Sequence, residues 1–335
     1  MRMNQAISAA IADEMRADPD VIVLGEDVAV AEGPFKTSAG LLDEFGPLRV
    51  RDTPISEMGF LGAAVGAAAT GLRPVVEIMF VEFLGVALDQ LSTEGAKFHY
   101  LSGGRVTVPL TIRASVGAGL GFGTQHSQTL ESWVMGTPGL KLAVASGPAS
   151  AYGLMRAAIR DDNPIVVLEP RRLYAQREDV TTGPEGVIPL GIARQVVDGD
   201  DATIVALGST VGTTAQAEAA ASWSADVIDL QSLQPWDRDT VYESVARTGR
   251  LVTVEENPLF GGWGADIVAA VAADLFGELK APPLRITAPD VPVPFGKELE
   301  ERYMPSSDYI NEQVTGLLHT GRVPSPWWEA EKGSP

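Results

Sequence analysis

The stretch from Asp52 to Phe83 constrains the fold of this chain more than any other part of the sequence. No residue between Met58 and Leu72 is charged, and small side chains dominate that run. Pro54 favours an extended backbone at Thr53, so we predict an extended lead-in followed by a helix that Ser56 caps. A helix without charges is typical of burial on all sides.

The same stretch then changes from helix to strand. Arg73-Pro74 ends the helix, and residues 75–80 form an apolar run typical of a buried strand. Gly62 and Gly66 lie four residues apart on one helical face, where another backbone can approach closely. Glu57 lies in the first turn of the helix, and two interpretations of it stay open. It is either an acid that the helix dipole favours, or a buried acid whose proton is used in chemistry.

Composition narrows the class of protein. A chain of 335 residues, 45% hydrophobic and 21% charged, is long enough for two globular domains. The net charge of −19 argues against nucleic acid or an anionic membrane surface as a partner. The uncharged run at 58–72 is shorter than the roughly 20 residues of a membrane span. The absence of cysteine excludes disulfides and thiolate chemistry, and it favours a reducing, cytoplasmic location.

Strand and helix patterns alternate along both halves of the chain, which predicts an α/β fold with mostly parallel sheets. The predicted strands are 21–24, 75–80, 106–112, 141–145, 164–169, 202–207, 225–230, 251–255 and 284–287. The predicted helices are 3–17, 57–72, 83–101, 149–160, 211–222, 237–248, 263–276 and 307–320. We expect residues 28–51 and 170–195 to be irregular.

Residues 117–128, with the sequence GAGLGFGTQHSQ, form the second informative stretch. Its alternating glycines predict a loop that adopts positive φ, and such a loop is either flexible or able to approach a ligand closely. The spacing is neither that of a dinucleotide fingerprint nor that of a Walker loop. The loop contains His126, one of three histidines that are too scattered in sequence to indicate a metal site. Asp161-Asp162-Asn163 offers oxygen ligands for a hard cation, or is simply a solvated acidic turn.

Taken together, these stretches resemble the β subunit of the thiamine-diphosphate-dependent first component of 2-oxo acid dehydrogenase complexes. That family includes the pyruvate, branched-chain 2-oxo acid and acetoin dehydrogenases. The match runs nearly end to end, through LGEDV at 24–28, RVRDTPISE at 49–57, GLRPVVE at 71–77, SGG at 102–104, GTQHSQ at 123–128, PGLK at 138–141 and RDDNP at 160–164.

The resemblance implies a transketolase-like fold of two domains. Residues 1–175 would form the pyrimidine-binding domain and residues 196–325 a transketolase C-terminal-like domain. A linker at 176–195 would join them, and residues 326–335 would be a tail.

The resemblance also implies the site residues. Glu57 would hydrogen-bond a pyrimidine nitrogen of thiamine diphosphate and so promote removal of the thiazolium proton, for which it should be desolvated. Phe83 would stack on the pyrimidine, although a place in the core is the rival interpretation, and Ile55 and Met79 would also line the cofactor. His126 would face the substrate channel and assist proton transfer. A structural potassium site would comprise Leu110, Ala158, Ile159, Asp161 and Asn163.

One absent motif bears on partners. The family holds Mg²⁺ and diphosphate through a Gly-Asp-Gly motif of the α subunit, and this chain lacks it. The resemblance therefore implies an α2β2 heterotetramer, with two β chains meeting at the Gly62/Gly66 face and the chain inactive alone. The further partners would be a lipoyl domain and the subunit-binding domain of an acyltransferase core.

The reaction implied is decarboxylation of pyruvate or a branched-chain 2-oxo acid, followed by reductive acylation of the lipoyl domain. The alternatives are an acetoin-cleaving dehydrogenase, a two-component oxidase or synthase without the lipoyl step, and a non-catalytic scaffold or regulatory subunit. Gly136 replaces a common family histidine, and residues 92–96 depart from the family pattern. Both departures leave the substrate open.

Overall fold

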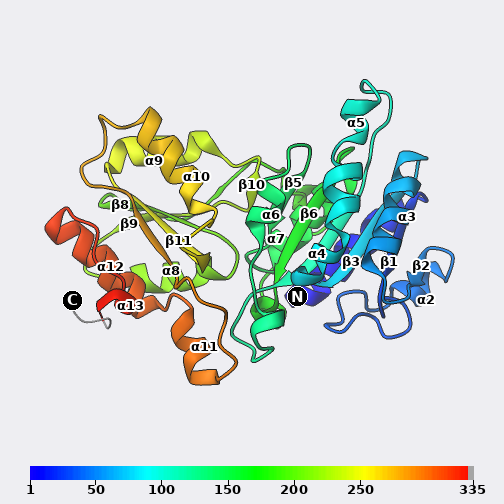
Figure 1. Ribbon diagram of the computed structural model, residues 1–335, viewed down its shortest axis with the longest axis horizontal. Helices are drawn as coiled ribbons and strands as arrows, with labels where there is room; N and C mark the ends of the chain where they lie inside the picture. The colour runs from blue at the N-terminus through cyan, green and yellow to red at the C-terminus, as the bar shows by residue number, and fades with distance from the viewer. Residues whose placement is uncertain (331–335) are drawn as a thin grey trace. The chain divides into compact units, whose positions relative to one another are not determined.

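The structure is a computed structural model that describes residues 1–330, and these residues divide into two compact units (Figure 1). The first unit comprises Met1–Gly117, Trp133–Leu190 and Ser232–Pro235. The second comprises Ala118–Ser132, Gly191–Gln231 and the chain from Trp236 onward. The glycine-rich loop therefore belongs to the second unit, although the segments on either side of it belong to the first.

The described part of the first unit contains a seven-stranded sheet in the order β10-β5-β6-β4-β3-β1-β2. Every neighbouring pair is parallel except β10 and β5, which are antiparallel. The strands are β1 (Val21–Gly25), β2 (Val50–Asp52), β3 (Arg73–Phe80), β4 (Thr111–Val116), β5 (Lys141–Val144), β6 (Ile165–Pro170) and β10 (Ser232–Gln234). The prediction of a mostly parallel α/β sheet is confirmed.

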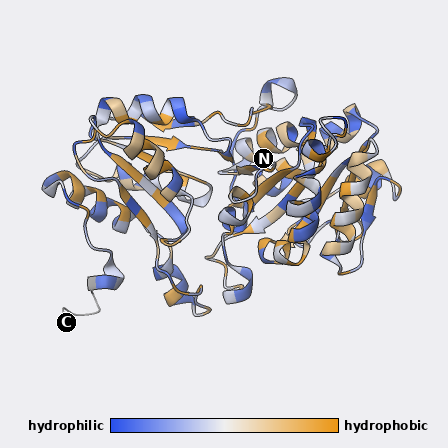
Figure 2. Ribbon diagram, turned by 45° about the horizontal axis from the view of Figure 1, so that its top comes forward, coloured by the Kyte–Doolittle hydropathy of each residue, from blue (hydrophilic) through white to orange (hydrophobic). Residues whose placement is uncertain are grey.

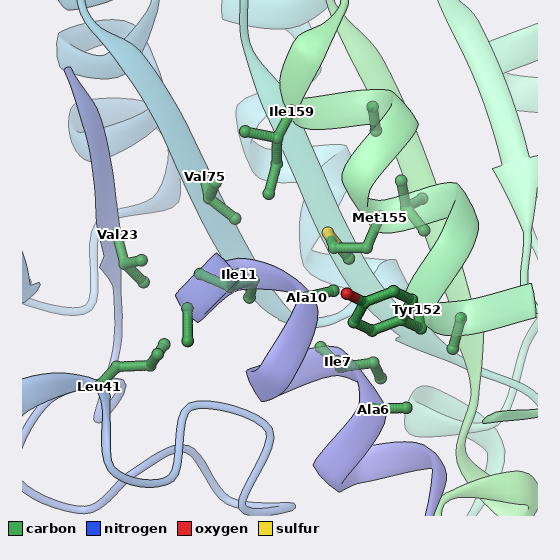
Figure 3. Packing of buried hydrophobic residues seen from close by; sticks show 14 of the residues in the cluster. Ala6, Ile7, Ala10, Ile11, Val23, Leu41, Val75, Tyr152, Met155 and Ile159 are labelled. Carbon is green, nitrogen blue, oxygen red and sulfur yellow. The ribbon is translucent and has the colours of Figure 1, made fainter. Parts of the chain in front are cut away.

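Two long helices, α1 (Met3–Ala17) and α7 (Pro148–Arg160), pack together against this sheet (Figure 3). Ile7 and Ile11 of α1 lie beside Met155 of α7, and all three are buried with apolar residues of β1 and β3. Burial of each such side chain contributes about 1.5–3 kcal/mol. The other helices of this part of the chain are α2 (Leu41–Phe45), α3 (Glu57–Ala69), α4 (Leu84–Asp89), α5 (Phe98–Leu101) and α6 (Glu131–Met135).

Helix α3 begins at Glu57 as predicted, but the predicted capping by the Ser56 side chain is wrong. Ser56 occupies the N-cap position without making a side-chain capping hydrogen bond. The helix is also not buried on all sides within this chain, because the face that carries Met58 and Gly66 is exposed. Met58 is 53% exposed. The uncharged sequence therefore creates a small, apolar face that no other described segment covers.

Strand β4 lies several residues later than the sequence pattern suggested. We predicted residues 106–112 with Arg113 at the end, whereas the strand spans Thr111–Val116 and holds Arg113 in its buried middle. A charge is tolerated there because two buried carboxylates from neighbouring strands pair with it.

The predicted helix at 83–101 is interrupted. A 3₁₀ turn, η1 (Val81–Phe83), and α4 are followed by a π-helical turn at Gln90–Gly95 and then by α5. The Ala96 amide donates to the Leu91 carbonyl at 2.9 Å. The two residues are five positions apart, which is the hydrogen-bond spacing of a π-helix.

The second unit contains a five-stranded sheet in the order β12-β11-β8-β9-β7, in which only β7 is antiparallel to its neighbour. Its strands are β7 (Arg194–Val197), β8 (Ala202–Ala206), β9 (Ala225–Asp229), β11 (Leu251–Pro258) and β12 (Leu284–Ala288). Its helices are α8 (Ser209–Ala219), α9 (Arg238–Thr248), α10 (Gly264–Asp274), α11 (Lys297–Tyr303), α12 (Ser307–Thr320) and α13 (Trp327–Ala330).

Helices α9 and α10 cover one face of the second sheet and α8 and α12 cover the other (Figure 1). In each unit the hydrophobic residues gather along the strands (Figure 2). The predicted strands and long helices of this half are confirmed within a few residues. The sequence reading missed the short strands β2, β7 and β10, and residues 28–51, which we expect to be irregular, contain α2. The predicted tail at 326–335 begins with α13, and residues 331–335 lie outside the described part.

Candidate functional site

The carboxyl ends of β1, β2 and β3 bring three predicted site segments to one edge of the first sheet. Gly25, the last residue of β1, pairs with Asp52 of β2 on one side and with Glu77 of β3 on the other. The chain leaves β1 toward β2 and then crosses back to β3, so the strand order reverses at this position. Open α/β sheets bind ligands at the carboxyl ends of their strands at such a reversal.

Short hydrogen bonds fix the segment that leads to Glu57. The Thr53 amide donates to the Gly25 carbonyl at 2.9 Å, and the Asp52 carboxylate accepts the Ala29 amide at 2.7 Å. These bonds join the end of β2 to the loop after β1. Glu57 follows at the start of α3 and is buried, with 8% of its surface exposed.

Glu26 is a site residue that the sequence reading did not single out. It directly follows β1, and one of its buried carboxyl oxygens has no hydrogen-bond partner. Burial raises the pKa of Glu26, and the nearby charges of Glu57 and Asp27 raise it further. The Glu-Asp pair at the end of a predicted strand was the available signal, but its proximity to Glu57 depends on the fold.

The three cofactor candidates Ile55, Met79 and Phe83 lie on the segments that end or follow β2 and β3. Ile55 is 85% exposed, and Met79 and Phe83 are half-buried. Phe83 lies in the turn η1, and its ring is nearly perpendicular to that of Phe80 at a centroid distance of 6.0 Å. Within this chain Phe83 is therefore not a fully buried core residue.

A fully buried ion cluster lies within the strands beneath this edge. Arg113 binds both carboxylate oxygens of Glu169 at 2.7 Å and also binds Glu77. The Tyr174 hydroxyl donates to Glu169 at 2.7 Å. Burial alone would lower the pKa of Arg113, but the charges of Glu169 and Glu77 raise it, so the guanidinium stays protonated.

The glycine-rich loop has the predicted positive φ at Gly119, Gly121 and Gly123. It is nevertheless held by the protein. The Ala118 amide donates to Glu256 at 2.7 Å, and the amides of Gly119 and Gly121 donate to Glu300 at 2.8 and 3.0 Å. These contacts argue against a freely flexible loop, and the alternative that the loop approaches a ligand closely stays a prediction.

His126 ends the 3₁₀ turn η3 (Thr124–His126) and is half-buried. A cavity of about 170 Å³ begins at the next residue, and its polar lining includes Ser127, Thr129, Glu256, Asn257 and Tyr303. Both Ser127 and Asn257 are buried there.

Glu131 follows the same loop, and its buried carboxyl group escaped the sequence reading. Burial raises its pKa to about 7, and the charges of Glu256 and Glu255 contribute to this shift.

The residues of the predicted potassium site meet where α7 leads into β6. The Leu110 carbonyl accepts the Ile165 amide at 2.9 Å, and the Asp161 carboxylate accepts the Asn163 side chain at 2.8 Å. Lys141 pairs with the same carboxylate. Burial would raise the pKa of Asp161, but the hydrogen bonds from Lys141 and Asn163 lower it. Residues 1–330 contain no cluster of three or more acidic, His or Cys side chains arranged to hold a metal.

Comparisons with known proteins agree with this architecture. Residues 1–176 match the transketolase pyrimidine-binding domain, and residues 191–310 match the transketolase C-terminal domain. A solved structure described as a split-gene transketolase, an inactive β4 tetramer, has the same fold with a TM-score of 0.78 at 23% identity. That similarity covers 96% of this chain and 99% of the solved one. The fold is therefore of the transketolase class, as predicted.

Curated relatives narrow the class further. The chain is 44% identical over 324 residues to the pyruvate dehydrogenase E1 component subunit beta of Rhizobium meliloti, covering 95% of this chain and 70% of that protein. It is 42% identical over 333 residues to the acetoin:2,6-dichlorophenolindophenol oxidoreductase subunit beta of Bacillus subtilis, covering 94% and 96% respectively. The chain belongs to the family of E1 β subunits of pyruvate and acetoin dehydrogenases.

Within residues 1–330 no helix combines the length and apolar character that crossing a membrane requires.

Proposed function

We propose that this chain joins an α subunit in a cytoplasmic α2β2 enzyme that decarboxylates pyruvate or a branched-chain 2-oxo acid. The acyl group would pass to a lipoyl domain, and the subunit-binding domain of an acyltransferase core would dock the enzyme. The observation that carries the proposal is the buried Glu57 at the strand-order reversal, on a chain that is 44% identical to a pyruvate dehydrogenase β subunit. Thiamine diphosphate would supply the electron sink for the carbanion.

The residues of this chain would bind and orient the pyrimidine half of the cofactor. Glu57 would hold a proton at a pyrimidine nitrogen, for which its burial is suited. Phe83 presents a half-buried ring for stacking, and Ile55 and Met79 offer apolar contacts at the same edge of the sheet. The diphosphate and Mg²⁺ are assigned to the α subunit, because this sequence lacks the Gly-Asp-Gly motif that holds them in the family.

His126 would move a proton during acyl transfer to the lipoyl group. Its half-buried position beside a polar cavity supports this role, since an imidazole ring can both accept and donate a proton.

Potassium would bind the carbonyl oxygens of Leu110, Ala158 and Ile159 together with Asp161 and Asn163. The three carbonyls each accept one hydrogen bond, which leaves a lone pair on each oxygen for a cation. A rise in melting temperature with KCl but not with equimolar NaCl would support this site, and equal curves would refute it.

Acetoin cleavage is the second candidate function. The Bacillus subtilis relative is similar over 96% of its own length, so the family comparison does not separate the two substrates. A scaffold without catalysis is disfavoured by the presence of Glu57 and His126, because a scaffold needs neither residue.

The decisive experiment uses the α2β2 complex captured with this chain, supplied with thiamine diphosphate and Mg²⁺. Reduction of an artificial electron acceptor is followed with pyruvate, branched-chain 2-oxo acids and acetoin. We expect turnover with one substrate class and its loss in Glu57→Ala, while the tetramer stays intact. Glu243→Ala, at a surface position in the second unit, is the matched control. Turnover that survives Glu57→Ala would refute the assignment.

A further inference from the structure

Strand β3 is irregular at the point where it delivers two of the cofactor candidates. Its register with β4 shifts between Ile78 and Phe80, so Met79 forms a bulge. A bulge bends its strand and redirects the side chains that follow, and bulges are common next to active sites. The direction of Met79, and of the turn that carries Phe83, therefore depends on how this bulge is held.

The buried Arg171 holds the bulge from below through β4. Its guanidinium donates to the Ser115 hydroxyl oxygen at 3.1 Å and to the Gly117 carbonyl at 2.6 Å. The Ser115 hydroxyl in turn donates to the carbonyl of Met79, the bulged residue. Arg171 is 2% exposed, so these contacts are shielded from water and strengthened accordingly.

The same guanidinium also lies over an aromatic ring that leads to Phe83. It is 5.0 Å from the centre of the Phe80 ring, a cation–π geometry. Phe80 makes edge-to-face contacts with Phe83 on one side and Phe35 on the other, both at 6.0 Å. The Arg171 side chain is thus linked to both cofactor candidates. It reaches the backbone of Met79 through Ser115, and it reaches the ring of Phe83 through Phe80.

We propose that Arg171 is a positioning residue for thiamine diphosphate, which sets the direction of Met79 and Phe83 toward the pyrimidine. This inference rests on the proposed function. Arg171 itself touches neither the substrate nor the reacting atoms; it acts through Ser115 and Phe80. A purely structural arginine would affect how much complex folds, whereas a positioning residue affects how tightly the folded complex binds its cofactor.

The test is a thiamine diphosphate titration of the cofactor-free α2β2 complex, followed by protein fluorescence or circular dichroism in the presence of Mg²⁺. Arg171→Met removes the donors and the charge, Arg171→Lys keeps the charge, and Arg172→Met makes the same charge change at the exposed neighbour. We expect cofactor affinity to fall by about tenfold to a hundredfold in Arg171→Met. Arg171→Lys should recover part of that loss, and Arg172→Met should bind as the wild type does. The kcat at saturating cofactor should change far less than the affinity.

Wild-type affinity in an assembled Arg171→Met complex would overturn the inference. If that variant does not assemble, Ser115→Ala decides, because it removes only the hydroxyl that links Arg171 to the Met79 carbonyl. We expect it to weaken cofactor binding, and unchanged binding would overturn the inference. A wild-type complex that binds no thiamine diphosphate would instead refute the proposed function, so the two failures are distinguishable.

Discussion

The amide of Gly119 donates a 2.8 Å hydrogen bond to the carboxylate of Glu300, which lies 181 positions further along the chain. Gly121 donates to the same buried carboxylate. One acidic side chain from α11 therefore binds two backbone amides of the glycine-rich loop that leads to His126. The glycine content of this loop suggests conformational flexibility, yet its backbone is hydrogen-bonded to carboxylates of the same unit.

Replacing Glu300 with alanine should release this loop. The amides of Gly119 and Gly121 lose a charge-assisted acceptor, and such hydrogen bonds contribute about 1.5–3 kcal/mol. Amide hydrogen exchange across residues 118–126 should accelerate by about tenfold or more. The control is Glu301→Ala, because Glu301 is exposed on the same helix. Equal exchange in the two variants would contradict the loop's dependence on Glu300.

The raised pKa of Glu131 predicts a pH dependence of stability. Its folded-state pKa of about 7 lies above the ordinary value near 4.5, so the folded chain binds the proton more tightly than the unfolded chain. The stability that this proton contributes is complete below about pH 4.5 and is lost as the pH rises through 7, on the order of 3 kcal/mol in total.

Glu131→Gln mimics the protonated form, so it should raise the stability relative to the wild type most strongly at pH 8 and little at pH 4.5. Urea unfolding of the full chain at both pH values measures this difference. A constant difference across the range would show that the carboxyl group titrates normally.

The buried cluster of Arg113, Glu77 and Glu169 predicts non-additive mutational effects. Arg113→Met leaves two buried carboxylates without their cation and should destabilise the chain by about 3–5 kcal/mol. Adding Glu77→Gln and Glu169→Gln to Arg113→Met should recover part of that loss, because no charge then remains buried. Chemical denaturation of the single and triple variants measures the coupling, and a triple variant less stable than the single one would contradict it.

The lowered pKa of Asp161 predicts a pH dependence of stability opposite to that of Glu131, with stability lost as the pH falls. Its folded-state pKa lies below the ordinary value near 3.8, so its contribution is present at neutral pH and disappears as the pH falls through the folded-state value. Lys141→Met removes the main hydrogen bond that lowers this pKa, and it should cost stability at pH 7 but little at an acidic pH at which Asp161 is protonated. The melting temperatures of both proteins at the two pH values provide the measurement, and parallel shifts would contradict the assignment.

The elements that the sequence predicts well are those whose signal is local. Helix α3 begins where Ser56-Glu57 indicates, and the strands of the second unit follow their apolar runs. Strand β4 was misplaced because Arg113 reads locally as a strand end. Its partners lie 36 and 56 positions away, so nothing near it in sequence shows that the charge is neutralised.

Contacts between residues distant in sequence also limit what can be predicted of the candidate site. Glu57, Phe83 and His126 are candidates because the motifs around them resemble those of the family, and their roles stay predictions. Glu26 and Glu131 could not be predicted, because their pKa shifts depend on burial and on carboxylates brought close only by folding. Arg171 reads as part of a charged linker, and its place beneath the Met79 bulge depends on the register of two strands.

The pairing of Glu77 with Arg113 across β3 and β4 has a further consequence for the newly made chain. Before the sheet assembles, each of these apolar strands carries a charge in its middle, which opposes aggregation into non-native β-structure. Only the correct register cancels those charges, because a slip of one residue would move the partners to opposite faces of the sheet. The cluster therefore favours the observed alignment of β3 and β4 over an alignment shifted by one residue.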